Sequence, residues 1–410
     1  MALTIQSKPV LYTAAYNHQT FVISSTNSAQ ANFTYQCSVV VAATVASAAS
    51  GSIVDELAPR PDNSRAYYNP QRTVEGYCKN EFYPTILDFQ YSLNGAITKI
   101  TYSIQEKYGT PPTLQGSAST GTYYVWNAAY QAPDFVDFTY TLGVKAKELT
   151  LAPSYANTIS INQKYLFKSW HLGTCSTIIY EMNIVAYDAA GNATASVLRN
   201  QFSTRSNYAT DYIIINVSPY GLNNYTGIIS SGTPGSIIPA NTVRYTMECY
   251  DNAGSPAQTT ETHTVYIDEG CGRYSRYVMH FLNRLGNYDC FTFDKVSRST
   301  AEKKDSSYKK LIFEGTNPPA YYKYSKDEVN YSTVVTNKIT LNSDWITDLE
   351  AVWLKDLIMS PDVYLEDSSG VLYSVKITDK SYETKKKDTD KLTSITINAE
   401  YTLEDIRQRG

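Results

Sequence analysis

YEMNIVAYDAAG, residues 180–191, is the stretch of sequence that decides the fold of this 410-residue chain. Its apolar residues alternate with other types, which is the period of a half-buried β-strand. The strand runs into Asp188 and Gly191, which favour a turn because aspartate caps turns with its side chain and glycine adopts positive φ. The stretch therefore predicts one arm of a β-hairpin, with residues 194–202 as the other arm.

A second stretch, YTMECYDNAG at residues 245–254, resembles the first and is followed by a strand-like segment at residues 259–267. Either an internal duplication or the common chemistry of hairpins explains the likeness. Residues 212–217 form a further expected strand between the two hairpins. This succession is typical of an Ig-like or related β-sandwich, which we assign to residues 151–268.

Alternating strands also dominate residues 1–150, which we expect to form an N-terminal β domain. In residues 32–41, Phe33, Tyr35 and Cys37 fall on one face, and residues 97–105 alternate in a similar way. Residues 46–69 contain prolines and turn formers, so we expect a connector there. The Gly/Ser/Thr run Gly116–Gly121 predicts a mobile surface loop.

Residues 269–410 are expected to form a separate α+β domain with one prominent helix. Ser343 or Asp344 can cap this helix, and Pro361 follows its end. Helical spacing predicts a buried apolar stripe that consists of Trp345, Leu349, Val352, Trp353 and Leu357. The sheet beneath the stripe would come from residues 363–365, 372–378 and 392–401.

The composition agrees with a mainly β chain built from β-sandwich domains of the Ig-like or jelly-roll-like kind, followed by the α+β domain. Tyrosine occurs 37 times and strand formers recur throughout, whereas runs of helix formers are scarce. The net charge of −4 argues against nucleic acid as a partner, because proteins that bind it usually carry a basic stripe.

The six cysteines lie far apart, so we expect free, buried thiols in a protein made in the reducing cytoplasm of a host cell. The first residues lack the basic and apolar regions of a secretory signal. The uncharged residues 38–54 are rich in Ser, Thr, Ala and Gly and are too short for a transmembrane helix. Membrane insertion is therefore not expected.

The usual signatures of catalysis are missing, since the chain has no nucleophile elbow, HExxH helix, phosphate loop or dinucleotide-binding glycine motif. No Cys/His spacing could close a metal site locally. His263 lies in an alternating strand, where we expect it to face solvent. The acidic pairs are of a kind found in any soluble chain: Asp134/Asp137, Asp268/Glu269 and Asp348/Glu350. We predict a non-enzymatic protein without cofactor or metal.

Paired tyrosines are the candidates for a binding surface, because tyrosine offers large, rigid, amphipathic contact area. The alternative is that these tyrosines fill strand positions with the hydroxyl in water. The candidate interface residues are Tyr67, Tyr68, Tyr123, Tyr124, Tyr321, Tyr322 and the nearby Trp126.

A set of short blocks, spread over nearly the whole chain, carries a family resemblance. The blocks are AYNH (15–18), FVISSTN (21–27), ANFTY (31–35), YNPQRTVEG (68–76), YVWNAA (124–129), YVMHFLNRLG (277–286), WLKDLIMSPDVYL (353–365), ITDKSYETK (377–385) and RQRG (407–410). In their order and spacing they resemble a group of virion structural proteins from tailed bacteriophages. One departure is Asn287, where a second glycine is expected after Gly286.

The resemblance implies a tail or baseplate subunit whose β-sandwich domains assemble into rings. The expected function is that of a virion structural protein that forms a homo-oligomeric ring and docks neighbouring tail proteins. The alternative is a receptor- or glycan-binding adhesin or fibre-type protein, with tyrosines stacked on a host-surface glycan. A third alternative is a carbohydrate-cleaving enzyme carried on the virion. The expected location is the tail of the virion.

Overall fold

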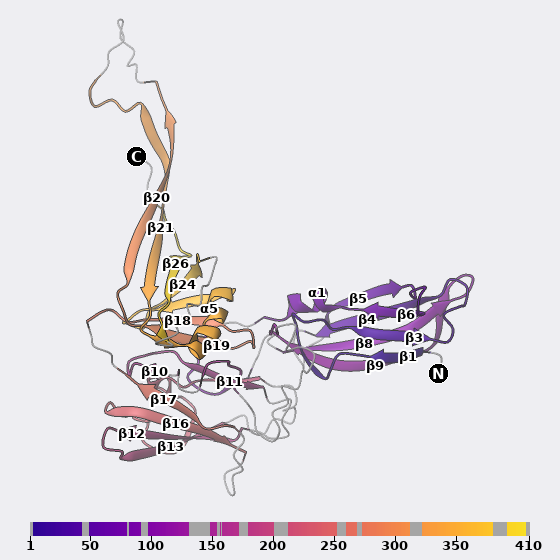
Figure 1. Ribbon diagram of the computed structural model, residues 1–410, viewed down its shortest axis with the longest axis horizontal. Helices are drawn as coiled ribbons and strands as arrows, with labels where there is room; N and C mark the ends of the chain where they lie inside the picture. The colour runs from indigo at the N-terminus through magenta and orange to yellow at the C-terminus, as the bar shows by residue number, and fades with distance from the viewer. Residues whose placement is uncertain are drawn as a thin grey trace, which may run out of the picture. The chain divides into compact units, whose positions relative to one another are not determined.

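The computed structural model is mainly β, as predicted (Figure 1), with 53% of the chain in strands and 7% in helices. It describes residues 3–42, 49–79, 82–91, 97–130, 148–153, 156, 158–171, 179–200, 212–251, 260–268, 273–311, 322–379 and 392–406. The chain forms two compact units, Met1–Asp268 with Asn283–Asp289, and Glu269–Leu282 with Cys290–Gly410. The expected division into domains 1–150, 151–268 and 269–410 stays a prediction.

The N-terminal part of the first unit consists of two sheets with a common core. The five-stranded sheet has the order β2 (Tyr12–Ala14), β9 (Thr113–Trp126), β8 (Ile97–Tyr108), β4 (Thr34–Ala42) and β5 (Ala49–Leu57). The three-stranded sheet has the order β1 (Leu3–Ser7), β3 (Phe21–Ser25) and β6 (Arg65–Tyr68). Alternate residues of β3, β4 and β8 are fully buried against one another, which is what the period-two pattern of these strands requires.

Two expectations for this region are wrong. The expected connector at residues 46–69 contains β5 and β6, and the expected loop Gly116–Gly121 lies inside β9. Gly121 stands opposite Tyr102 of β8, and the Tyr102 ring fills the space that a side chain at Gly121 would need. Gly121 therefore allows the Tyr102 ring to pack closely against the backbone of β9, and it does not form a turn.

The rest of the first unit is organised by a six-stranded and a three-stranded sheet. The six-stranded order is β10 (Thr158–Ile159), β17 (His263–Ile267), β16 (Thr242–Tyr250), β12 (Glu181–Asp188), β13 (Ala193–Arg199) and β15 (Ile228–Ser231). The three-stranded order is β11 (Phe167–His171), β14 (Tyr212–Asn216) and β7 (Gln90–Tyr91). Short helical segments occur at α1 (Gln71–Val74), η1 (Glu75–Tyr77) and α3 (Pro219–Asn223).

The predicted hairpin at residues 180–202 is present as β12 and β13. The Asp188 carboxylate accepts the backbone N–H groups of Ala190 and Asn192 at 2.9 and 2.8 Å, and Gly191 has φ 84°. β16 and β17 form the second antiparallel pair, although its turn at residues 252–259 lies outside the described residues. β12 pairs with β16, so the two pairs lie side by side in one sheet.

The segment Asn283–Asp289 belongs to the first unit, although the residues on both sides of it belong to the second. The Asn283 carboxamide donates to the Leu149 carbonyl oxygen at 2.9 Å and accepts the N–H of Asn287 at 3.1 Å. The Trp126 indole N–H donates to the Leu285 carbonyl oxygen at 3.3 Å. Gly286 has φ 89°, so the turn forms with a single glycine.

The second unit is built on an eight-stranded sheet. Its order is β19 (Tyr288–Phe293), β18 (Tyr277–Leu282), β23 (Val363–Glu366), β24 (Leu372–Ile377), β26 (Thr396–Tyr401), β21 (Glu328–Asn342) and β20 (Arg298–Lys309), with β27 (Asp405–Ile406) also paired to β21. A separate two-stranded sheet joins β22 (Ile346–Thr347) and β25 (Leu392–Thr393).

The expected single helix is two short helices, α4 (Asp348–Trp353) and α5 (Lys355–Met359). The cap is Thr347, whose hydroxyl accepts the Glu350 N–H at 3.3 Å while the Glu350 carboxylate accepts the Thr347 N–H at 2.7 Å. Ser343 is not the cap, because its hydroxyl instead accepts the N–H of Ile395. No helix within the described residues is long and apolar enough to span a bilayer.

The predicted apolar stripe is only partly buried. Trp353 and Leu357 are buried, but Trp345, Leu349 and Val352 are 64%, 63% and 61% exposed. The buried face of the helices also contains Ala351 and Leu354, which are fully covered. α4 begins only at Asp348, so Trp345 lies outside the helix, and Leu349 and Val352 lie on the exposed side of α4.

Candidate functional site

A two-stranded ribbon projects from the sheet of the second unit (Figure 1). We use the name ribbon for residues 298–310 and 322–342, which contain β20 and β21. β20 is the last strand of its sheet, and all of its residues except Ser306 are exposed. β21 pairs with β26 over Lys338–Asn342 and with β27 at Val334 and Val335. Among the described residues, β20 is the sole neighbour of residues 328–333.

Contacts between exposed side chains support this ribbon. Lys338 pairs with Glu302 across the strands, and the Ser307 hydroxyl donates to Glu328. The Thr333 hydroxyl donates to Asp305 at 2.7 Å. Such solvated contacts are weak, because water and dissolved salt screen exposed charges. Two-stranded ribbons are marginal in water, so a neighbouring surface would stabilise this one.

The far end of the ribbon gathers large exposed side chains next to lysines. Tyr322 and Tyr324 stack with their ring centroids 5.1 Å apart and an interplanar angle of 13°. The exposed apolar or aromatic residues at this end are Tyr308, Leu311, Tyr322, Tyr324 and Tyr331. Lysines at positions 309, 310, 323 and 326 are exposed beside them. Aromatic rings with long basic side chains are typical of protein-binding surfaces.

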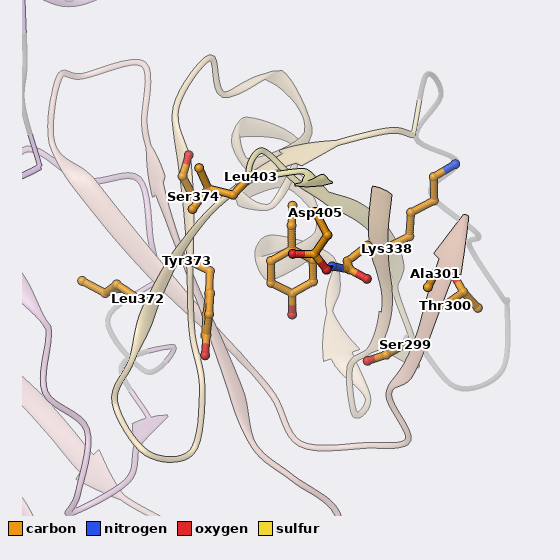
Figure 2. Close-up of a pocket in the computed structure, with 11 residues that line it drawn as sticks. Ser299, Thr300, Ala301, Lys338, Leu372, Tyr373, Ser374, Leu403 and Asp405 are labelled. Atoms are coloured by element: carbon orange, nitrogen blue, oxygen red, sulfur yellow. The ribbon is translucent and has the colours of Figure 1, made fainter. Parts of the chain in front are cut away.

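An open groove of about 560 Å³ lies where the ribbon joins the sheet (Figure 2). Tyr373 and Tyr401 meet edge to face in it, with ring centroids 5.5 Å apart. The Tyr373 hydroxyl donates to the Asp367 carboxylate at 3.4 Å, and Asn337 donates to Asp405 at 3.2 Å. The remaining lining residues are Ser299, Thr300, Ala301, Lys338, Leu372, Ser374 and Leu403.

The two groove tyrosines stay neutral over the physiological pH range. Burial, and then the neighbouring Tyr277 and Tyr373 rings, raise the pKa of Tyr401 above its usual value of 10.0. Burial and the Asp367 carboxylate raise the pKa of Tyr373. Both hydroxyls can therefore donate hydrogen bonds, and the groove combines aromatic rings with hydroxyl, amide and carboxylate groups.

Three of the candidate interface residues lie in the interior of the first unit. Tyr68, Tyr123 and Trp126 are buried, so in this structure they cannot offer a binding surface. Tyr68 packs near Phe21, and the Tyr123 hydroxyl donates to Gln19 at 2.9 Å. Consecutive residues of a strand face opposite sides of the sheet, so one tyrosine of each adjacent pair enters the core.

The other candidates differ in exposure. Tyr124 is half-buried and stacks on Tyr12, with ring centroids 5.5 Å apart. Tyr67 is exposed beneath the Arg60 guanidinium, which lies 4.4 Å from its ring centroid. Tyr322 is exposed at the end of the ribbon, and Tyr321 lies outside the described residues. An interface role stays a prediction for the exposed members.

Sequence reasoning missed Tyr324, Tyr331 and Tyr373, which are exposed around the ribbon and the groove. None of them is adjacent to a second tyrosine in the sequence. The available signal was the spacing Tyr322-Lys-Tyr324, because residues two apart in an extended chain share a face.

A buried charged cluster in the first unit has the residue types of a catalytic site, but its side chains are not open to a substrate. Glu148 contacts the Lys168 ammonium at 2.6 Å and the His263 ring at 3.1 Å. Burial raises the pKa of Glu148, but Lys168 and His263 outweigh burial and hold it below its usual value. His263 is mostly buried, so the expectation that it faces solvent is wrong. The cluster is closed to a substrate, which favours a structural role.

The remaining candidates for chemistry do not converge. Asp134, Asp137 and Glu269 lie outside the described residues, and Glu350 belongs to the helix cap. A second buried pair in the second unit joins His280 to Glu366 at 2.8 Å. Within the described part of the chain, no group of three His, Cys, Asp or Glu side chains could hold a metal ion.

Comparison with family models and with curated proteins finds no relative. No protein-family model matches the chain, and no curated protein matches it either.

Proposed function

We propose that this chain is a virion structural protein of a tailed bacteriophage, made in the host cytoplasm and built into the tail or baseplate. In this proposal it forms a homo-oligomeric ring and docks neighbouring tail proteins, without enzymatic activity. The two N-terminal sheets, which share a core, and the other sheets of residues 1–268 would serve as β-sandwiches of the Ig-like or jelly-roll-like kind.

The ribbon is the observation that carries the proposal. A monomer gains little from an exposed two-stranded extension, because such an element has no core of its own. The extension becomes stable when a neighbouring subunit covers it, as subunits do in an assembly. Open strand edges and exposed tyrosines on the ribbon offer both backbone and side-chain contacts for that purpose.

Sedimentation velocity of the purified protein, together with electron microscopy and mass spectrometry of purified virions, tests the proposal. We expect a closed oligomer and the presence of the chain in particles. A variant in which residues 302–336 are replaced by Asn-Gly should keep its β-type circular dichroism and lose assembly, since Ala301 and Asn337 are cross-strand partners. A strictly monomeric protein that is absent from virions would contradict the proposal.

A glycan-binding adhesin of the fibre type is the second candidate, and the groove is the observation that favours it. Sugars bind aromatic rings through their C–H faces and polar side chains through their hydroxyls, and Tyr373, Tyr401 and Asp405 offer both. Glycan-array binding should be lost in Tyr373→Ala and kept in Tyr67→Ala. The two side chains are equally exposed, at 38%, which makes Tyr67 a matched control. An array without signal would remove this candidate.

A further inference from the structure

We propose that the ribbon of one copy docks on the helix face of the next copy, where helix face means the exposed side chains of Trp345, Leu349 and Val352. This inference rests on the proposed assembly function and names the two surfaces that would meet. Because the surfaces differ, the contact is head to tail, and repeated head-to-tail contacts that close generate a ring.

The ribbon is a basic surface on an acidic chain. Its eight basic residues are Arg298, Lys303, Lys304, Lys309, Lys310, Lys323, Lys326 and Lys338, and its four acidic residues are Glu302, Asp305, Asp327 and Glu328. The ribbon thus has a net charge of +4, whereas the whole chain has −4. Two ribbons would repel each other, so a different region of the neighbour is the better partner.

The helix face is an apolar patch that the fold of its own unit leaves uncovered. Leu349 and Val352 are three residues apart and share one side of α4, and Trp345 precedes the Thr347 cap by two residues. All three side chains are more than 60% exposed. Single exposed apolar residues are ordinary, but three such side chains within residues 345–352, one of them a tryptophan, are typical of a binding surface.

The chain around the helix face is acidic, whereas the ribbon is basic. In residues 343–379, the acidic side chains at least partly on the surface are Asp344, Asp348, Glu350, Asp362, Asp367 and Asp379, and the basic ones are Lys355 and Lys376. Their net charge is −4, without counting the buried Asp356 and Glu366, and it becomes −3 when Lys295, which pairs with Asp344 at 2.6 Å, is included. The surface charge is therefore opposite to that of the ribbon.

Both surfaces also match in chemistry. The exposed tyrosines at the ribbon end offer flat amphipathic rings for contact with Trp345 and Leu349. Lysine stems can cover apolar surface while their ammonium groups reach the surrounding carboxylates. Electrostatic complementarity of this kind favours the head-to-tail arrangement over a ribbon-to-ribbon one.

The test uses two variants of the full chain in sedimentation velocity. Lys309→Glu/Lys310→Glu alters the ribbon only, and Leu349→Ser/Val352→Ser alters the helix face only. All four positions are exposed, so both variants should fold like the wild type by circular dichroism. Each variant alone should assemble at least tenfold more weakly than the wild type. Val54→Ser/Leu114→Ser, at exposed apolar positions of the first unit, should assemble normally.

Mixing the two variants gives the sharpest result. In a head-to-tail contact, the intact ribbon of one variant still fits the intact helix face of the other, so an equimolar mixture should form a dimer and stop there. Added salt should weaken both this dimer and the wild-type assembly. Tyr324→Ser, at a second exposed position of the ribbon, provides an independent variant.

Several outcomes would overturn the inference. If either altered variant assembles normally, or if the mixture forms no dimer, the ribbon does not dock on the helix face. Neither outcome would contradict the proposal that the chain forms a ring. A wild-type chain that never assembles would remove both. Binding of a fluorescent oligonucleotide that Lys309→Glu/Lys310→Glu abolishes, with assembly unchanged, would assign the ribbon to nucleic acid instead.

Discussion

Lys168 and Glu148 form a buried ion pair in the first unit, with the ammonium nitrogen 2.6 Å from a carboxylate oxygen and side-chain exposures of only 3% and 4%. Removing both charges from water costs several kcal/mol, and their mutual attraction with the nearby His263 offsets this cost. The pair therefore makes each partner dependent on the other.

Lys168→Met should destabilise the first unit strongly, because it leaves Glu148 buried without its closest positive charge. We expect a loss of about 3–5 kcal/mol in the free energy of unfolding, measured by urea denaturation. Lys107→Met is the control, since the Lys107–Glu56 pair is solvated and its loss should cost less than about 1 kcal/mol. Equal effects of the two substitutions would contradict this assignment.

Acid should weaken the same part of the structure through Glu148. Its pKa in the folded chain lies below the ordinary value of 4.5, so its stabilising contribution is complete above that value and is lost as the pH falls through the folded pKa. Glu148→Gln should flatten this part of the dependence of stability on pH. Urea denaturation at pH 7 to 3 measures the effect, and identical pH profiles for variant and wild type would exclude it.

Gly121→Ala should destabilise the N-terminal sheets, because the added methyl group would overlap the Tyr102 ring on the neighbouring strand. Overpacking of this kind costs about 1–3 kcal/mol. Gly76→Ala is the matched control, since open space surrounds that position. In thermal denaturation, Gly121→Ala should have a lower midpoint than the wild type, and Gly76→Ala should not. A midpoint for Gly121→Ala at or above that of Gly76→Ala would contradict the overlap with Tyr102.

The buried cysteines should resist alkylation in the native state. Burial raises the pKa of Cys37 and Cys249 to about 12 and that of Cys78 to about 11, so little thiolate is present near pH 8. Mass spectrometry after iodoacetamide treatment should show these thiols unmodified until denaturant is added, with the half-buried Cys290 reacting earlier. Rapid native modification of Cys37 would contradict its burial.

The local sequence pattern predicted where the strands lie better than it predicted which strands pair with one another. Alternation identified β8 and β12, because period two follows directly from one buried face. It failed at Gly121, where the deciding contact is a ring on another strand, and at α4, where Thr347 and Glu350 outcompete Ser343 as a cap. Cross-strand register and the choice between caps depend on tertiary packing that a single segment does not contain.

The candidate surfaces were harder to predict for the same reason. Adjacent tyrosines such as Tyr123 and Tyr124 divide between core and surface, as the strand pleat requires. Exposure of Leu349 depends on which face of α4 is buried, and Trp345 lies before the Thr347 cap, outside the helix. The lysine pairs 303–304 and 309–310 are visible in the sequence, but the isolation of the ribbon from the core is not.

The placement of Asn283–Asp289 limits how this gene can be shortened or exchanged. A coding sequence cut after residue 268 would deprive the Trp126 indole and the Leu149 carbonyl of their hydrogen-bond partners, which are supplied by Leu285 and Asn283. Recombination between related genomes should therefore avoid the stretch from 269 to 289, and a stable N-terminal fragment would have to be inherited, or cloned, with that loop attached.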